Sequence, residues 1–140
     1  MRPTTILLVE DDTLISEVLT SVLEDEGYLV VAAHDGEQAI ALLATSRPHL
    51  ALLDVMMPLV DGREVLKHIR STEATRDLPV ILMSASPLSV LDGAESYSLF
   101  LRKPFDLQTL LDEIVRILPR KQSGEGPRAT PPARISAETS

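Results

Sequence analysis

The sequence contains no cysteine and no tryptophan, and only 3% of its 140 residues are aromatic. The absence of cysteine excludes disulfide bonds, thiolate metal sites and cysteine nucleophiles. The apolar runs are short, and none approaches the roughly 18 to 20 residues that a membrane-spanning helix needs. The start, MRPTTILLVEDD, reaches acidic residues too early for a signal peptide. We therefore expect a cytoplasmic protein without membrane contact.

Basic residues are scarce as well, and the formal net charge is -8. Residues 1–119 hold 9 Lys and Arg against 19 Asp and Glu, whereas residues 120–140 hold 4 against 2. A strongly acidic domain repels phosphate backbones. The charge pattern therefore predicts no direct binding of nucleic acid.

Hydrophobic residues make up 44% of the chain, which is enough for the packed core of one domain. We assign that domain to residues 1–119. Residues 120–140 are rich in Pro, Gly and Ser and contain almost no large apolar side chain, so burial cannot offset the entropy cost of ordering them. We predict a disordered tail or linker there.

Five short apolar runs of strand length alternate with stretches of helical periodicity. The predicted strands are Thr5 to Val9, Tyr28 to Ala33, Leu50 to Leu53, Leu78 to Met83 and Phe100 to Arg102, and the predicted helix caps are Asp12 or Thr13, Asp35 and Asp106. This alternation predicts a doubly wound α/β domain, in which helices cover both faces of a parallel sheet. Residues 85–98 contain Pro87, Gly93 and small polar residues, so we expect the fourth helix to be short or irregular.

Polar side chains follow four of these strands where each strand ends. They are Glu10 and Asp11 after the first strand, Asp54 after the third, Ser84 after the fourth and Lys103 after the fifth. In open parallel sheets, ligands bind beyond the carboxyl ends of the strands. If the first and third strands are neighbours, three carboxylates converge there, and their repulsion favours a bound cation.

The predicted donors are oxygen atoms, with no His or Cys nearby, which favours Mg²⁺ over Ca²⁺. Lys103 adds a positive charge and Ser84 a hydroxyl group on the other side of Asp54. A metal ion, a lysine and a hydroxyl group around a carboxylate are the groups that phosphoryl transfer requires.

The motifs LLVEDD, LLDVMMPLVDG, PVILMSA and LRKPF occur in this order between Thr5 and about Leu118. Together they resemble the receiver domain of bacterial two-component response regulators. The resemblance implies a flavodoxin-like fold, a five-stranded parallel sheet in the order 2-1-3-4-5. It also implies a signalling module rather than an enzyme, with at most slow self-dephosphorylation.

The resemblance assigns Asp54 as the phosphoacceptor, which takes the phosphoryl group from a phosphohistidine of a sensor histidine kinase or histidine phosphotransfer protein. Asp11 and Asp54 would hold Mg²⁺ through their carboxylates, Met56 through its backbone carbonyl and Glu10 through water. The partner that receives the signal is an unknown downstream protein, and a homodimer is compatible with the family.

The remaining implied roles belong to the last third of the chain. Lys103 would pair with the phosphoryl oxygens, and Ser84 would hydrogen-bond one of them. Phe100 stands where the family carries its switch aromatic, and Ser84 would move together with it. The resemblance also implies a cis peptide bond before Pro104.

Simpler interpretations stand beside these roles. Asp54 is compatible with a turn residue, Glu10 with a helix-cap acid, Ser84 with a strand-end hydroxyl that bonds backbone, and Phe100 with a core side chain. An aspartyl phosphatase is disfavoured because the position two residues after the nucleophile is Met56 rather than an acid. A receiver-like adaptor that works without phosphorylation remains the alternative. No output domain follows, so the chain is either a stand-alone receiver or a part of a longer protein.

Overall fold

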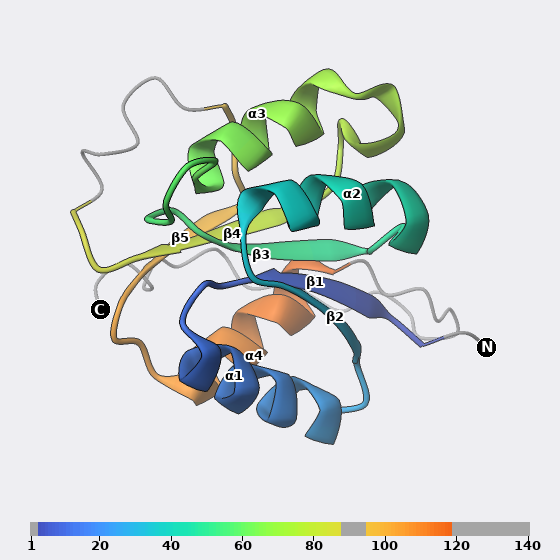
Figure 1. Cartoon of the computed structure of the whole chain (residues 1–140). Coiled ribbons are helices and arrows are strands. Elements are labelled where there is room, and N and C mark those ends of the chain that lie inside the picture. Colours follow the sequence, from blue (N-terminus) through green and yellow to red (C-terminus); the bar gives the residue numbers. More distant parts are fainter. Residues whose placement is uncertain (1–2, 88–94, 119–140) are drawn as a thin grey trace.

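The computed structural model describes residues 3–87 and 95–118. Its centre is a sheet of five parallel strands in the order β2-β1-β3-β4-β5 (Figure 1). The strands are β1 (Thr5–Val9), β2 (Leu29–Ala33), β3 (Leu50–Asp54), β4 (Val80–Ser84) and β5 (Leu99–Arg102). The doubly wound α/β architecture and the strand order predicted above are confirmed.

In the described part of the chain, four helices cover the two faces of this sheet. They are α1 (Thr13–Asp25), α2 (Gly36–Ser46), α3 (Gly62–Ser71) and α4 (Leu107–Ile117), and a 3-10 turn, η1 (Glu73–Thr75), follows α3. Helices α2 and α3 lie on one face, and α1 and α4 lie on the other (Figure 1). Each pair buries its own apolar cluster against the sheet.

The central strands are buried on both sides, which explains their continuous apolar sequences. Every residue of β1, β3 and β4 is buried. Covered parallel strands have this composition because neither face meets water. The exception at the end of β3 is Asp54, which is therefore a polar group in an apolar setting.

The helices begin at acidic caps, as predicted for three of them. The side chains of Asp12, Asp35 and Asp106 each accept a hydrogen bond from the backbone N–H three residues later. The fourth cap, Asp61, was not among the predicted caps. It begins α3, in a reciprocal capping box with Glu64.

Several boundaries shift by one or two residues from the predicted ones. Strand β2 begins at Leu29 rather than Tyr28, and β4 begins at Val80 rather than Leu78. The bond between Lys103 and Pro104 is cis, as the resemblance implied. The irregular fourth helix was predicted within residues 85–98, of which residues 88–94 lie outside the described part of the chain, and the tail predicted across 120–140 lies outside it as well. Within the part that is described, no helix is long and apolar enough to cross a membrane.

Candidate functional site

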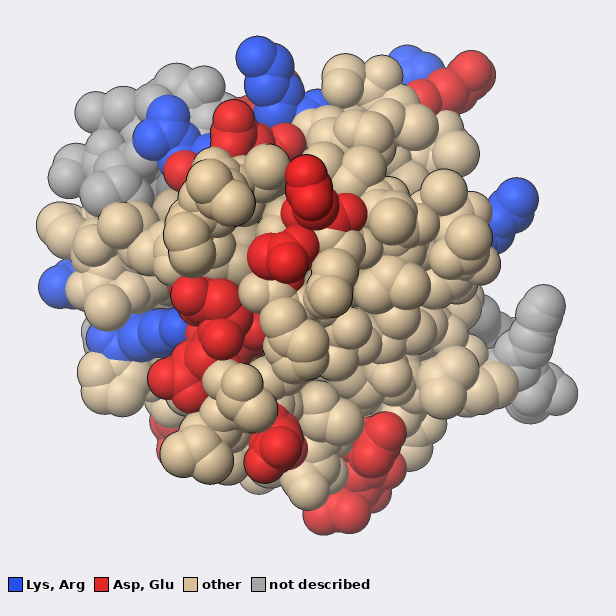
Figure 2. Space-filling view, in the orientation of Figure 1, with Lys and Arg blue, Asp and Glu red and all other residues tan. Residues whose placement is uncertain are grey.

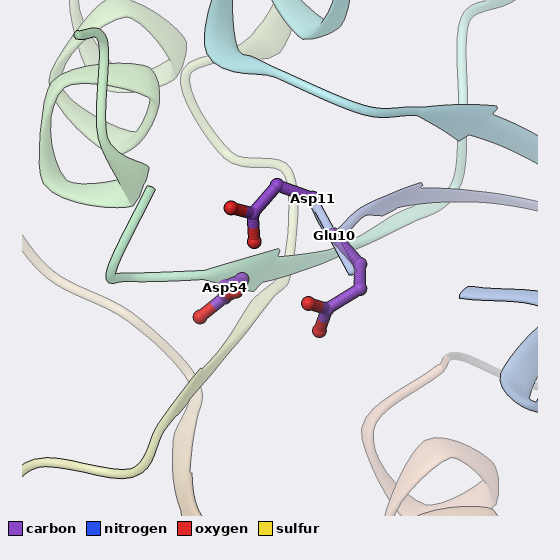
Figure 3. A group of neighbouring side chains, drawn as sticks. All are labelled: Glu10, Asp11 and Asp54. Atoms are coloured by element: carbon purple, nitrogen blue, oxygen red, sulfur yellow. The ribbon is translucent and has the colours of Figure 1, made fainter. Parts of the chain in front are cut away.

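The carboxyl ends of β1 and β3 bring three carboxylates together. The two strands are parallel neighbours, with Val9 opposite Leu53, so the residues that follow them meet at the same edge. One oxygen from each of Glu10, Asp11 and Asp54 lies within 4.8 Å of the others, and Figure 3 shows the group at the strand ends. The convergence predicted from the sequence is thus present in the fold.

Asp54 is held in place by the loop that follows it. Its side chain is nearly buried, with 4% of the residue exposed, and its Oδ1 atom accepts a hydrogen bond of 3.2 Å from the Met56 N–H. The loop returns beside Asp54 at Gly62, where a Cβ atom would lie 2.4 Å from the Asp54 carbonyl oxygen. Only glycine permits this close approach, so Gly62 belongs to the support of the site.

Lys103 reaches into the acidic cluster from the end of β5. Its Nζ atom lies 2.9 Å from Glu10 Oε1 and 3.5 Å from Asp54 Oδ2. Burial lowers the pKa of Lys103, but the hydrogen bond to Glu10 and the charges of Asp54 and Glu10 outweigh it, so the net pKa is raised. The lysine therefore stays protonated at neutral pH.

The environment of Asp54, in contrast, disfavours the charged form of its side chain. Burial, followed by the negative charge of Glu10, raises the pKa of Asp54 to about 7, although Lys103 and the Met56 N–H oppose the shift. One lysine thus fails to compensate three acids. A second cation at the cluster would restore the ionised form of Asp54 at neutral pH.

Glu10 is buried and makes an ion pair that neither interpretation of the sequence predicted. Only 1% of Glu10 is exposed, and Oε1 pairs with Lys103 while Oε2 accepts a hydrogen bond from the Asp12 N–H at 3.1 Å. The two partners of the ion pair are 93 residues apart and come from strands that are not neighbours. Sequence reasoning placed both residues at the site but missed this pair, which only the reach of the lysine side chain suggests.

Ser84 and Phe100 occupy the predicted strands, but their contacts match the simpler interpretations. Ser84 is fully buried, and its Oγ atom accepts a hydrogen bond of 3.0 Å from the Ser86 N–H. Phe100 is half-buried opposite Leu82 and packs against the apolar cluster beneath α2 and α3. A movement of either residue therefore stays a prediction.

The surface around the site is acidic. Figure 2 shows Asp and Glu side chains spread across this face, with fewer Lys and Arg side chains. The clustered donors are carboxylate oxygens, which suit a hard divalent cation. The residues present therefore fit Mg²⁺.

A family model described as "Response regulator receiver domain" matches residues 6–115. The chain belongs to this family. Receiver domains are signalling modules, and the strand order, the acidic cluster and the lysine of this receiver domain agree with the resemblance in its sequence.

Individual relatives support the same assignment. The receiver domain is 41% identical over 131 residues to the response regulator MprA of Mycobacterium sp. (strain KMS), covering 89% of this chain and 55% of the relative. The chain thus spans about half the length of the curated relatives it matches. The chemotaxis protein CheY4 of Vibrio cholerae is 31% identical, with a TM-score of 0.77 over 84% of this chain and 100% of that structure.

A third relative carries a metal. The receiver domain of a sensor histidine kinase from Pseudomonas aeruginosa PAO1 is 30% identical, with a TM-score of 0.76 over 82% of this chain and 97% of that one. That structure is described with a magnesium ion coordinated in its active site cleft.

Proposed function

We propose that this receiver domain accepts a phosphoryl group on Asp54 in the presence of Mg²⁺ and thereby changes a partner-binding surface. The observation that carries the proposal is the buried Asp54 carboxylate between two further acids and the Lys103 amine. A buried acid with a raised pKa, close to a fixed cation, is typical of a reactive group rather than of a helix cap.

Asp11 and Asp54 would hold Mg²⁺ with their carboxylates, Met56 with its backbone carbonyl and Glu10 through water. When bound, the ion supplies positive charge that neutralises the acids and the phosphoryl oxygens. This chain's own residues do the rest. The hydrogen bond from the Met56 N–H orients Asp54, and the loop that Gly62 closes keeps that carboxylate at the rim of the sheet.

The transfer itself exchanges one bond for another. An Asp54 oxygen attacks the phosphorus atom, the P–N bond to the donor histidine breaks, and a P–O bond to Asp54 forms. Lys103 lies 3.5 Å from Asp54 Oδ2 and would shift its contact toward the new phosphoryl oxygens, while Ser84 would donate a hydrogen bond to one of them. The donor would be a sensor histidine kinase or a histidine phosphotransfer protein.

Phosphorylation would act as a population shift. It replaces the Asp54 carboxylate with an acyl phosphate that carries roughly -1.5 to -2 charges, which favours an inward position of Ser84 and its turn and a repacking of Phe100. The surface of β4, β5 and α4 would then change for a downstream protein or a second copy of the chain. The acidic charge of residues 1–119 disfavours direct binding of nucleic acid by this domain, and we propose a cytoplasmic location.

The alternative is an adaptor that works without phosphorylation. The contacts of Ser84 and Phe100 described above keep this alternative open. Titration with Mg²⁺ and beryllofluoride, which together mimic an aspartyl phosphate, separates the two functions. A phosphorylated switch shows a coupled spectral change at Ser84 and Phe100, and an adaptor shows none.

The direct test is labelling by a small phosphodonor such as acetyl phosphate, followed by intact mass measurement. The wild-type chain should gain one phosphoryl group in Mg²⁺ and none in excess chelator. Asp54→Asn should lose the label completely, whereas Asp35→Asn should keep it, because Asp35 is an exposed helix cap and asparagine also caps helices. A label that persists unchanged in Asp54→Asn would remove the proposal.

A further inference from the structure

Arg102, the last residue of β5, contacts the turn that follows β4. Its Nε atom donates a hydrogen bond of 3.1 Å to the backbone carbonyl of Ala85. Ala85 directly follows Ser84, and Ser84 pairs with Arg102 in the register of the sheet. None of the roles assigned above uses this arginine.

The turn from Ser84 to Ser86 has two further bonds. The Ser86 N–H donates to Ser84 Oγ at 3.0 Å, and the Lys103 N–H donates to the Ser84 carbonyl at 2.8 Å. Residues at the end of β5 therefore make two hydrogen bonds to the turn, one from the backbone of Lys103 and one from the side chain of Arg102. The backbone contact belongs to the sheet, so the side-chain contact is the one that can break while the strands stay paired.

Within residues 3–87 and 95–118, Arg102 is not paired with an acid. Among the described residues, the ion pairs involve Lys103 and Arg116 but not Arg102, which is exposed. The bond that the structure gives its guanidinium group is the one to the Ala85 carbonyl. Positioning of the turn is thus the role that its contacts support.

We propose that Arg102 is a positioning residue that holds Ser84 and its turn in the resting position and so sets how easily the receiver domain switches. The inference rests on the proposed function, in which Ser84 moves toward a phosphoryl group on Asp54. Such a movement shifts the neighbouring Ala85 carbonyl and breaks its bond to Arg102. Loss of the arginine therefore favours the switched position.

The first test needs no phosphate analogue. In the metal-free protein, Arg102→Met should accelerate hydrogen exchange of the Ser86 amide, measured by NMR, by roughly twofold to tenfold, the effect expected for one hydrogen bond. The matched control is Arg116→Met, which removes an arginine from α4 and should leave Ser86 exchange unchanged. Unchanged Ser86 exchange in Arg102→Met would overturn the assignment.

The second test measures the switch. In Mg²⁺ and high salt, which screens the loss of a positive charge, Arg102→Met should bind beryllofluoride roughly twofold to tenfold more tightly than wild type. Mg²⁺ affinity alone should not change, and the gain should disappear in a Ser84→Ala background. Weaker or equal beryllofluoride binding in Arg102→Met, or a gain that persists in Ser84→Ala, would contradict the role. Failure of the wild type to bind beryllofluoride at all would instead contradict the proposed function, and the exchange measurement would still decide the role of Arg102 in holding the turn.

Discussion

Charged side chains at the two ends of the sheet differ in how well their charges and hydrogen bonds are satisfied. At the amino ends of β4 and β5, Arg70 from the last turn of α3 donates to three backbone carbonyls, those of Ser96, Arg76 and Leu78, at 2.8 to 3.0 Å. At the carboxyl ends, three acids lie together, and Lys103 pairs with two of them, Glu10 and Asp54. The first arrangement satisfies its groups and stabilises the fold, whereas the second leaves negative charge uncompensated.

This contrast separates charge that stabilises the fold from charge that the proposed function would use. Burial lowers the pKa of Arg70, and the nearby Asp77 and Glu95 partly offset that shift, but its Nε and Nη1 atoms donate to backbone carbonyls. Asp54 carries a pKa raised to about 7 because burial and Glu10 both act against its ionised form. A fold keeps such an unfavourable group where its chemistry is needed.

The largest expected effect on the free energy of unfolding comes from the removal of Lys103. Lys103→Met leaves Glu10 and Asp54 buried without their cation, so we expect the free energy of unfolding at pH 8 to fall by about 3 to 5 kcal/mol. Denaturant titration measures it. Arg116→Met is the control, because the Arg116 pair with Glu113 is partly exposed and should contribute less than about 1 kcal/mol. Equal losses of stability in both variants would show that the buried acids do not depend on Lys103 for charge compensation.

The next effect is a gain in stability. A carboxyl group whose pKa is about 7 in the folded state and about 3.9 in the unfolded state binds more protons when folded, so its contribution is lost as pH rises from about 4 through 7. Without divalent ions, Asp54→Asn should therefore be more stable than wild type by roughly 2 to 4 kcal/mol at pH 8, and by much less at pH 4. Denaturant titrations at both pH values measure the difference. A destabilised Asp54→Asn at pH 8 would refute the assigned electrostatics.

A smaller effect is expected at the opposite end of the sheet. Arg70→Met removes three hydrogen bonds to backbone carbonyls and should reduce the free energy of unfolding by about 1 to 3 kcal/mol. The loss should be the same at pH 5 and pH 8, and Mg²⁺ should not change it. A loss that depends on Mg²⁺ would mean that the two ends of the sheet are coupled.

Much of this arrangement could be predicted from the sequence, because it depends on local patterns. Continuous apolar runs predict buried parallel strands, and an acid after such a run marks the edge where ligands bind. The positions of Glu10, Asp11, Asp54 and Lys103 followed from these patterns, and the resemblance supplied the strand order.

What the sequence could not give were contacts between distant side chains. The pairing of Glu10 with Lys103 crosses two intervening strands, and the contact of Arg102 with the Ala85 carbonyl depends on the path of a turn. Asp61 was not among the predicted caps because Asp-Gly pairs favour turns, but in the structure it caps α3 in a capping box with Glu64. The proposed movement of Phe100 would need a second conformation, which a single sequence pattern does not specify.

The most direct test is the effect of Mg²⁺ on thermal unfolding at pH 8, compared between the wild-type chain and Asp11→Asn. Asp11 is exposed and contributes a carboxylate to the cluster, so its loss removes a ligand while leaving the core intact. We predict a saturable rise of the wild-type midpoint with Mg²⁺ concentration and a much smaller rise in Asp11→Asn. An unfolding midpoint that does not change with Mg²⁺ concentration, or that rises equally in both proteins, would contradict a metal-assisted phosphoacceptor site.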